Sequence, residues 1–448
     1  MTEPVERPGG LFGLSRAAKA RLLDRLGALP APLPAPAAEP AGRLRPEALP
    51  GAREVALVAA AAARLDIADP YFRVHDGIAG ASATIAGRSY ANFSSYDYLA
   101  LNGDPRIVEA AKAAIERYGT TVSASRAVSG ERPLHRELEA ALAAVYRAED
   151  SMAMVGGHAT NVSVIGALLG RDDLVVHDAL AHNSIVEGAR LAGAQRRAFA
   201  HNDPAAAEEM LRAAGARRRL IVVEGHYSMD GDVPDLAAFA ALARRHGAWL
   251  MVDDAHALGV LGAGGLGSAE HAGIDPGEVD LWMGTLSKSL VSCGGYIAGR
   301  KPLIDRLKRL VPGFVFSVGM PPPAAAAALA ALRILRAEPE RVARLRRNAA
   351  LFLDLLRSAG LDTGGSIGAA IVPVITGSSV RAGQLAEALF ARGVNVHPIL
   401  YPAVPERAAR LRFFVGAGHA EAQLRDSAGA VIEEARRIAV DPVGLGGA

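Results

Sequence analysis

The sequence predicts an α/β protein with a mostly parallel sheet flanked by helices and a smaller α+β unit towards the C-terminus. Two observations support this fold class. Apolar segments of strand length alternate with helical segments from residue 151 to about residue 322. A long helical stretch, further apolar segments and a last helix then follow. Ligands of parallel sheets bind at the carboxyl ends of the strands, so polar residues after the predicted strands are candidate site residues.

The composition excludes several classes of protein. The 448 residues, 50% hydrophobic and 21% charged, are enough for a large core and more than one domain. The net charge of +2 gives no reason to expect nucleic acid or an anionic membrane as a partner. The one cysteine, Cys293, predicts a reducing compartment, the cytoplasm, and the spacing of Cys and His residues indicates no metal site. No apolar run reaches the ~18–20 residues of a membrane span, and Glu3 and Glu6 argue against a signal peptide.

We divide the chain into four parts. Residues 1–53 are an N-terminal arm with a Pro/Ala-rich linker, because the run Pro30–Gly42 favours extended geometry. Both a docking tail and an extension without a role fit this arm. Residues 54–110 form an N-terminal segment, residues 111–322 a large cofactor-binding domain, and residues 323–448 a small α+β domain.

The N-terminal segment and the start of the large domain predict a hairpin and two helices. Ser82–Ile85 and Arg88–Phe93 have strand character and are joined by a turn that contains a glycine. A helix is expected from about Pro105. Leu134–Tyr146 has apolar residues at helical spacing, so it predicts an amphipathic helix.

The predicted strands of the large domain are Met152–Val155, Leu174–His177, Leu220–Val223, Trp249–Asp253 and Leu281–Gly284, and Pro234–His246 is one of the helices between them. The small domain is predicted to contain strands at Ala370–Ile375, Val394–His397 and Ala409–Val415 and a last helix at Ala420–Ile438. Each motif described below follows one of the strands of the large domain.

Lys288 is the central candidate residue. The apolar strand before it ends at Gly284, and Thr285, Leu286 and Ser287 then turn the chain. A lysine flanked by hydroxyl residues at a strand end is suited to a Schiff base with pyridoxal phosphate. A surface lysine after a strand fits this segment alone equally well.

Asp253 and His256 follow the strand Trp249–Asp253. A carboxylate at a buried strand end is costly unless it is paired, and a protonated pyridine nitrogen would pair it. His256, three residues on, would then lie within reach of the phenolic oxygen of the same ring. A capping aspartate and a core histidine are the alternative.

Three further segments become candidates for the same site because of the segments that contain Lys288 and Asp253. In Met154–Asn161, a strand runs into two glycines and a helix, which favours a phosphate at the helix N-terminus. His182 follows the next strand and is placed to stack on a ring. Ser228 lies in the polar segment Val223–Asp232 as a candidate hydrogen-bond donor. Each of these signals is weak by itself.

The segment Gly262–Gly267, GAGGLG, matches the dinucleotide-binding pattern G-x-G-x-x-G. It does not follow directly on a strand, no helical pattern begins inside it, and no strand-end acidic residue lies about 20 residues further on. We therefore predict a flexible loop without a nucleotide.

Together the motifs resemble the α-oxoamine synthases, which are pyridoxal-phosphate enzymes of fold type I. The family includes 8-amino-7-oxononanoate synthase, serine palmitoyltransferase, 5-aminolevulinate synthase and 2-amino-3-ketobutyrate CoA ligase. The resemblance covers about residues 54–440 and is specific, because seven motifs occur in the order of the family: NFSSYDYLAL, SRAVSGERPLHRELE, GGHATN, DALAHNSI, EGHYSMDGD, VDDAHALGVLG and GTLSKSL.

The resemblance implies a role for each candidate that faces the cofactor ring. Lys288 corresponds to the lysine of the internal aldimine. Asp253 corresponds to the partner of the pyridine nitrogen and His256 to the partner of the phenolic oxygen. His182 corresponds to the residue that stacks on the ring face.

The remaining candidates correspond to residues around the phosphate and the ring edge. The amides of Gly157 and His158 and the hydroxyl of Thr285 would hold the phosphate, and Ser228 would line the ring. The family is usually a homodimer with active sites at the subunit interface, so the resemblance also implies a homodimer.

The chain departs from the family at three places. Val318, next to Ser317, stands where the family commonly has a hydroxyl residue that reaches the phosphate across the dimer. Leu400 stands where several members have an arginine for the amino-acid carboxylate, and Arg412 is not an obvious replacement. His158 stands where Phe or Tyr is common.

The reaction that the resemblance implies is a decarboxylative condensation of a small amino acid with an acyl thioester to an α-amino ketone. Lys288, displaced by the amino acid, would remove the Cα proton. The donor would be coenzyme A or an acyl-carrier protein. The segment PILYPAVPERAARLRFF and the N-terminal arm favour a carrier-bound or long acyl chain. The alternatives are an aminotransferase of the same fold type and a non-catalytic partner subunit of a synthase.

Overall fold

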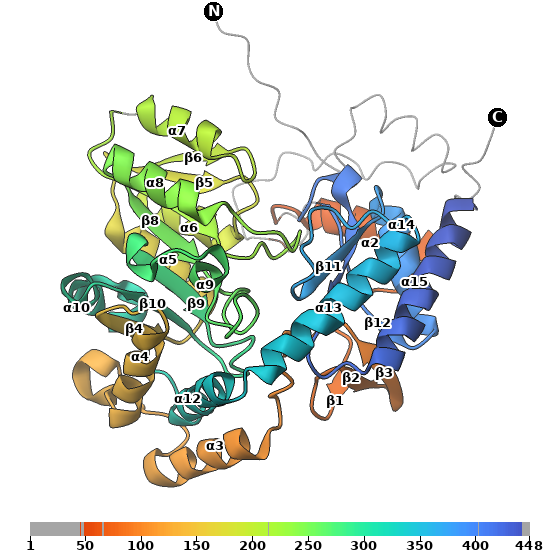
Figure 1. Ribbon diagram of the computed structural model, residues 1–448, viewed down its shortest axis with the longest axis horizontal. Coiled ribbons are helices and arrows are strands. Elements are labelled where there is room, and N and C mark those ends of the chain that lie inside the picture. Colours follow the sequence, from red (N-terminus) through yellow and green to blue (C-terminus); the bar gives the residue numbers. More distant parts are fainter. Residues whose placement is uncertain (1–44, 46–48, 65–66, 214, 402, 441–448) are drawn as a thin grey trace, which may run out of the picture.

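The computed structural model describes residues 45, 49–64, 67–213, 215–401 and 403–440. Most of the predicted arm, including the run Pro30–Gly42, lies outside these residues. In the described part, two units lie side by side, a larger one built on a central sheet and a smaller one formed by both ends of the chain (Figure 1).

The larger unit is built on a sheet of seven strands within the described residues, in the order β4-β10-β9-β8-β7-β5-β6. The strands are β4 (Asp150–Met154), β5 (Leu174–Asp178), β6 (Gln195–Phe199), β7 (Arg219–Glu224), β8 (Trp249–Asp253), β9 (Leu281–Thr285) and β10 (Gly295–Gly299). β10 pairs antiparallel with β4 and with β9, and the pairs among β5, β6, β7, β8 and β9 are parallel. The predicted mostly parallel sheet is therefore confirmed.

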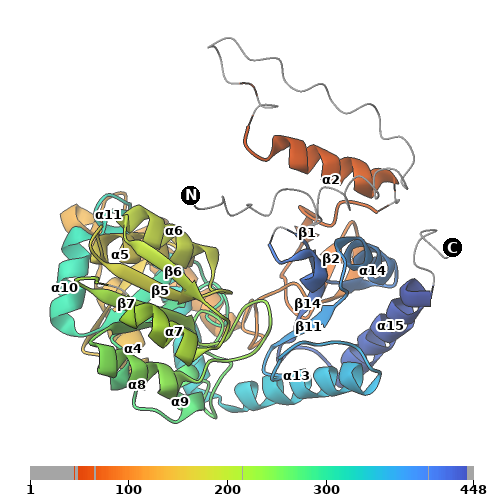
Figure 2. The same ribbon diagram turned by 90° about the horizontal axis from the view of Figure 1, so that it is seen from above.

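Both faces of this sheet are covered by helices (Figures 1 and 2). Alternate residues of one strand enter different apolar cores: Leu174 and Val176 of β5 lie in one, and Val175 lies in the other. A strand buried on both faces reads as a continuous apolar run, which is why the sequence predicted β5, β7, β8 and β9.

The helices of the larger unit are α3 (Pro105–Tyr118), α4 (Pro133–Val145), α5 (Gly157–Leu168), α6 (Asn183–Ala192), α7 (Pro204–Arg212), α8 (Leu236–His246), α9 (Ser268–Ala272), α10 (Lys301–Leu310), α11 (Pro312–Val315) and α12 (Pro322–Ala337). Shorter helical turns are η3 (Arg126–Gly130) and η4 (Pro276–Glu278). α12 packs against α3 and α4.

Two strands of the larger sheet have no counterpart among the predicted strands. β6 lies at the sheet edge, and its sequence QRRAF leaves two arginines outside the apolar core, so it lacks an apolar run. β10 has the sequence GYIAG, in which glycines stand at both ends. A Cβ on Gly295 would lie 2.6 Å from the Cα of Gly157, so a glycine is needed where β10 meets the start of α5.

The smaller unit contains two sheets. The first has the order β11-β14-β13, from β11 (Ile371–Ile375), β13 (His397–Ile399) and β14 (Arg410–Phe414), and is antiparallel. The second has the order β1-β2-β3-β12, from β1 (His75–Asp76), β2 (Ser82–Ile85), β3 (Arg88–Asn92) and β12 (Val394–Asn395). The predicted hairpin is β2 and β3, while the predicted strand Val394–His397 is divided into β12 and β13.

The N-terminal segment and the C-terminal part of the chain thus share one unit, because β12 pairs in parallel with β3. Figure 2 shows α13 running from the boundary with the larger unit along the smaller one. Phe93 after β3 packs between Phe352 and Phe413, with ring centres 5.1 and 5.3 Å away. The helical elements of this unit are α2 (Ala52–Arg64), α13 (Glu340–Ser358), α14 (Ser379–Ala391), α15 (Glu421–Val440) and the short turn η5 (Glu406–Ala408).

None of the helices within the described ranges is both long enough and apolar enough to cross a membrane. In the same residues, no three His, Cys, Asp or Glu side chains are grouped so that they could hold a metal ion.

Candidate active site

The carboxyl ends of β4, β5, β7, β8 and β9 meet at one edge of the large sheet and surround a cavity of about 210 Å³. All eight residues singled out in the sequence line this cavity: Gly157, His158, His182, Ser228, Asp253, His256, Thr285 and Lys288. The structure therefore brings all eight residues together, and their individual roles are taken up below as proposals.

Lys288 lies just beyond β9, in the wall between this inner cavity and a second, outer chamber. Burial lowers the pKa of its ammonium to about 8, although the carboxyl groups of Asp253 and Glu224 act in the opposite direction. Its Nζ lies 5.8 Å from the centre of the Tyr96 ring. A desolvated lysine of this kind is partly neutral near pH 8 and can act as a nucleophile or as a base.

Asp253 is the last residue of β8 and is 5% exposed. Its Oδ2 accepts a hydrogen bond of 2.7 Å from the Asn161 side chain, and its Oδ1 accepts one of 3.0 Å from the Ala255 amide. Asn161 also donates to the Ser184 hydroxyl, which is 2.7 Å from Nδ1 of His182. Donors to both oxygens fix the direction of the Asp253 carboxyl group.

His256 follows Asp253 by three residues and lies between two aromatic residues of different segments. Its Nδ1 is 2.8 Å from the Tyr98 hydroxyl, and its ring is nearly parallel to the ring of Phe414, at 12°. Burial, aided by the cations Lys288 and Arg412, holds the pKa of His256 well below its usual range. His256 is therefore a neutral imidazole at physiological pH.

His182 caps the start of α6, where its Nδ1 accepts from the Ser184 amide at 3.3 Å. Burial lowers the pKa of His182, with Asp253 acting in the opposite direction. The ring of His158 meets it edge to face, with ring centres 6.1 Å apart. The His182 ring is thus held at the cavity wall by its own helix cap.

The start of α5 provides a site for an anion. The first N–H groups of a helix have no acceptor within the helix itself, and the N-cap of α5, Gly156, has no side chain to cap them. A Cβ on Gly157 would lie 3.0 Å from the Thr285 hydroxyl, so the two residues approach closely only because Gly157 lacks one. The first amides of α5 thus lie beside the Thr285 hydroxyl at the cavity, and that hydroxyl donates to the Gly294 carbonyl at 2.9 Å.

The arrangement fits pyridoxal phosphate. The start of α5, which suits an anion, and the buried carboxyl group of Asp253 both line the cavity that Lys288 also lines. Within the described residues, Oδ1 of Asn161 and Oε1 of Glu224 are buried polar atoms of this cavity without a hydrogen-bond partner. Buried polar atoms of this kind are normally satisfied, so a polar ligand suits the cavity.

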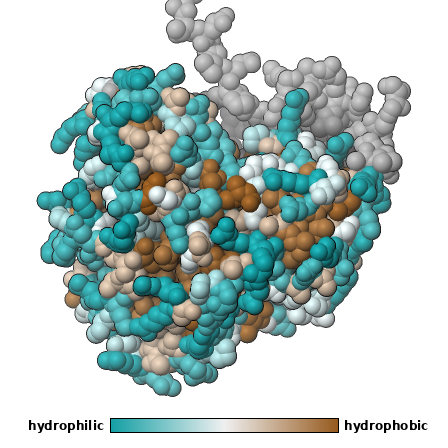
Figure 3. All heavy atoms as spheres, in the orientation of Figure 1, coloured by the Kyte–Doolittle hydropathy of each residue, from teal (hydrophilic) through white to brown (hydrophobic). Residues whose placement is uncertain are grey.

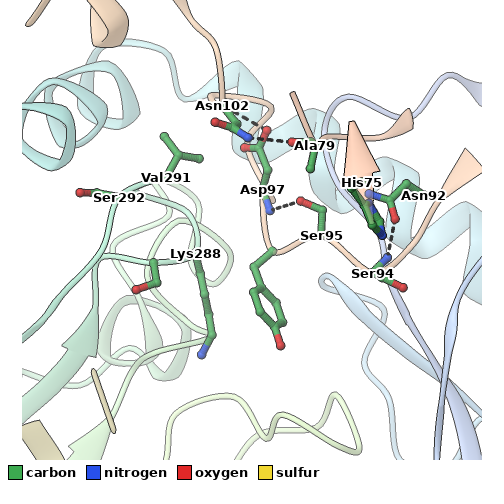
Figure 4. Close-up of a pocket in the computed structure, with 12 residues that line it drawn as sticks. His75, Ala79, Asn92, Ser94, Ser95, Asp97, Asn102, Lys288, Val291 and Ser292 are labelled. Carbon is green, nitrogen blue, oxygen red and sulfur yellow. Dashed lines mark hydrogen bonds between the residues drawn. The ribbon is translucent and has the colours of Figure 1, made fainter. Parts of the chain in front are cut away.

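The outer chamber has a volume of about 400 Å³ and shares Ser287 and Lys288 with the inner cavity. Lys288, Val291 and Ser292 form one side of it, and the N-terminal segment forms the other (Figure 4). The wall contributed by that segment is mostly polar and comprises His75, Ala79, Asn92, Ser94, Ser95, Tyr96, Asp97 and Asn102.

Several residues near the cavity were not predicted to have a role. Asn161 lies one turn into α5 from Gly157, and Glu224 is the last residue of β7, so both stood inside motifs already recognised. Arg412 on β14 is directed to the loop after β7, where its Nη1 donates to the Ser228 carbonyl at 3.0 Å. Only the pairing of the two units brings Arg412 to the site.

Of the three positions at which the chain departs from the family, only one lines a cavity of the site. Val318 and Leu400 line neither the inner cavity nor the outer chamber. Ser317 is half-buried, and its hydroxyl donates to the Val318 carbonyl at 3.2 Å. His158 does line the inner cavity.

The GAGGLG segment is organised around a carboxylate of the chain itself. The amides of Gly264 and Leu266 donate to the two oxygens of Glu270, at 2.9 and 2.8 Å. These amides therefore have an acceptor of their own, in agreement with the prediction that the glycine pattern is not a nucleotide site.

A mostly parallel sheet with a lysine after one strand and a carboxylate at the end of the next defines the class of protein, the pyridoxal-phosphate enzymes of fold type I. A family model described as aminotransferase class I and II matches residues 88–431. An 8-amino-7-oxononanoate synthase from Anaeromyxobacter sp. (strain K) is 43% identical over 345 residues, which cover 77% of this chain and 86% of the relative.

Solved structures give the same result. Serine palmitoyltransferase from Sphingomonas wittichii is 30% identical with a TM-score of 0.83, covering 87% of this chain and 98% of that one. An SPT with a PLP internal aldimine is 29% identical with a TM-score of 0.82, covering 87% and 99%. The chain belongs to the aminotransferase class I and II family and, within it, to the α-oxoamine synthases. It is an enzyme, and its cofactor is pyridoxal 5'-phosphate.

Proposed function

We propose that the enzyme condenses a small amino acid with an acyl thioester, with loss of carbon dioxide, to give an α-amino ketone. The observation that carries this proposal is the place of Lys288 between two spaces, the inner cavity and the outer chamber. A base at this junction can act on an amino acid held at the cofactor while a second substrate approaches from the other side. The relatives whose names are synthases of this type support the assignment.

The roles of the inner residues follow from their surroundings. When bound, pyridoxal phosphate supplies an electron sink for negative charge at the Cα of the amino acid. Asp253 is a carboxylate that can hold a proton on the ring nitrogen. If Tyr98 donates to Nδ1 of His256, then Nε2 of His256 carries the proton and can donate to the ring oxygen. Lys288, with its lowered pKa, is the group that takes the Cα proton.

The phosphate is proposed to be held by Gly157, His158 and Thr285. His182 is proposed to lie against the face of the ring. The amides at the start of α5 are available for an anion, and His182 is fixed by its hydrogen bond to Ser184. Ser228 lines the cavity beside Glu224, to which its amide donates, and its hydroxyl is proposed to face the ring edge.

Arg412 is proposed to bind the carboxylate of the amino acid. Leu400, which stands where several family members have an arginine for this role, has no charge and cannot perform it. The side chain of Arg412 lies over the Phe414 ring, 4.5 Å from the ring centre, and its Nε is buried with no partner among the described residues. Arg412 also acts electrostatically on Lys288, His182 and His256, so its charge is directed at the site. Arginine keeps its charge even when burial lowers its pKa, as it does here.

The outer chamber is proposed to receive the arm of the thioester. Its serine and asparagine side chains suit the amide groups of a pantetheine arm better than an alkyl chain. Coenzyme A and an acyl-carrier protein share this arm, so the proposal includes both as possible donors of the acyl group.

The active enzyme is proposed to be a homodimer. Phe316 and Val128 are 86% and 83% exposed, and they lie on neighbouring segments, at the end of α11 and in η3. Val318, 47% exposed, continues the same surface. Hydrophobic residues also reach the surface of the face shown in Figure 3. Large exposed apolar side chains that lie together are typical of an interface.

The proposal is tested by following the absorption of the bound cofactor while glycine, alanine and serine are added in turn. One of them should change the spectrum, and adding an acyl-CoA or an acyl-carrier protein should then release carbon dioxide and a ketone. An amino-group transfer, with a keto acid as product and no carbon dioxide, would identify an aminotransferase instead. Because Arg412 provides a candidate carboxylate site, which an aminotransferase also needs, the products decide between the two.

A further inference from the structure

Glu224 is a buried carboxyl group of the inner cavity to which the proposed reaction gives no role. It is the last residue of β7, as Asp253 is the last residue of β8, and the two are direct partners in the parallel pairing of these strands. Side chains at paired positions of neighbouring strands point to the same face. Both also line the inner cavity, so two carboxyl groups stand side by side within it.

The two carboxyl groups have different hydrogen-bond partners. Each oxygen of Asp253 accepts a hydrogen bond, from Asn161 and from the Ala255 amide. Oε2 of Glu224 accepts one from the Ser228 amide at 3.2 Å, and the His182 amide also stabilises its charged form. Oε1 of Glu224 has no partner within the described part of the chain. The proton of a carboxyl pair belongs on the oxygen that lacks a donor.

The charged groups around Glu224 come from four other segments. Asp253 on β8 disfavours its ionisation, while Lys288 after β9 favours it. Arg412 on β14 and the hydroxyl of Tyr227, in the loop after β7, also interact with its charge. Burial has the largest effect, and together with Asp253 it raises the pKa of Glu224 to about 8.

We propose that Glu224 is a positioning residue that keeps a proton on Oε1 beside the ionised Asp253, so that the pair carries one negative charge. Its second oxygen meanwhile holds the loops that carry Ser228 and His182. One negative charge matches the one proton that Asp253 is proposed to hold on the ring nitrogen, so this inference rests on that part of the proposed function. A second charge would change the protonation of the cofactor.

The proton can be observed directly by infrared spectroscopy, because a protonated carboxyl group and a carboxylate absorb at different frequencies. The difference spectrum between the wild-type enzyme and Glu224→Gln should contain a protonated carboxyl band at pH 7, both with and without the cofactor. Without the cofactor, this band should give way to carboxylate bands as the pH passes about 8. Carboxylate bands at pH 6 to 7 would overturn the proposal.

Two further variants identify the band. Glu224→Asp keeps a carboxyl group, so it should shift the band rather than remove it. If Glu224→Gln does not fold, this shift identifies the band in its place. Asp253→Asn removes the neighbouring charge, so the band should be lost at a lower pH than in the wild type. An exposed glutamate on α3, changed in Glu116→Gln, is the matched control and should leave the band unchanged.

The effect on the cofactor is a separate readout. The absorption of the bound cofactor should change with pH in a step that Glu224→Gln lacks and Glu116→Gln retains, whereas a merely structural role would not remove such a step. Identical pH profiles for the wild type and Glu224→Gln would overturn the positioning role. Failure of the proposed reaction would not affect the infrared result on the cofactor-free protein, so the two failures can be told apart.

Discussion

The inner cavity and the outer chamber share Lys288 and Ser287 but are built in different ways. The inner cavity lies at the ends of buried parallel strands, and its residues Asp253, His182 and His256 are held by hydrogen bonds to Asn161, Ser184 and Tyr98, respectively. The chamber outside it is lined mainly by the N-terminal segment from His75 to Asn102, with mostly polar side chains. The difference places the groups proposed to carry the chemistry at strand ends, and the proposed site of the second substrate against a segment from another part of the chain.

Lys288→Ala is the strongest test of this comparison, because Lys288 belongs to both spaces. We expect the cofactor absorption band to disappear after dialysis and the rate of ketone formation to fall by about a thousandfold or more. The measurement is a spectrum of the dialysed variant, followed by a product assay with added cofactor. A variant that retains the band through dialysis would show that another residue holds the cofactor.

Asp253→Asn tests the inner cavity alone. Loss of the carboxylate removes the group proposed to hold a proton on the ring nitrogen, and we expect kcat to fall by about 100- to 1,000-fold. Because Asn161 and the Ala255 amide would face an amide in its place, the cofactor spectrum should also change. If binding of the thioester weakened as much as kcat, the two spaces would not be separable.

The sequence predicted this inner cavity better than the outer chamber, and the reason is local structure. The bounds of β8 are as predicted. Asp253 ends this strand, and His256 and Lys288 lie three residues beyond β8 and β9, so their position along the chain indicates their position in the fold. Their roles remain proposals. The cytoplasmic location and the division of the chain at residues 53, 110 and 322 likewise remain predictions.

Residues that depend on contacts between distant segments were not predictable. Glu224 lies beside Asp253 only because β7 pairs with β8. Arg412 reaches the site only because β14 contacts the loop after β7. The outer chamber needs β1 and the loop before α3 to lie against Lys288. β6 was missed because an edge strand with two arginines shows no apolar run.

The pH dependence of cofactor capture sharpens the account of the inner cavity. Lys288 has a pKa of about 8 in the cofactor-free protein, and only the neutral amine is nucleophilic. The rate at which this protein takes up pyridoxal phosphate should therefore rise about fiftyfold from pH 6 to pH 8 and then level off. Stopped-flow absorption measures this rate. A rate that still rose steeply above pH 9 would mean that burial does not lower the pKa of Lys288.

Arg412→Leu tests the boundary of the inner cavity with the smaller unit. Loss of a charged hydrogen-bond donor to a carboxylate should raise the KM for the amino acid by at least about tenfold, with little change in the KM for the thioester. The exposed arginine on the same segment, changed in Arg407→Leu, is the matched control and should leave both constants unchanged. An unchanged KM for the amino acid in Arg412→Leu would remove Arg412 from the proposed site.

His75→Ala is the smallest change and tests the outer chamber alone. His75 lines the chamber from β1, whereas the next residue, Asp76, is exposed. Loss of one polar contact should raise the KM for the thioester roughly two- to fivefold, while the spectral response to the amino acid stays the same. Asp76→Ala should change neither. If His75→Ala altered the spectral response to the amino acid instead, the chamber would be part of the amino-acid site, and the division of labour across Lys288 would not hold.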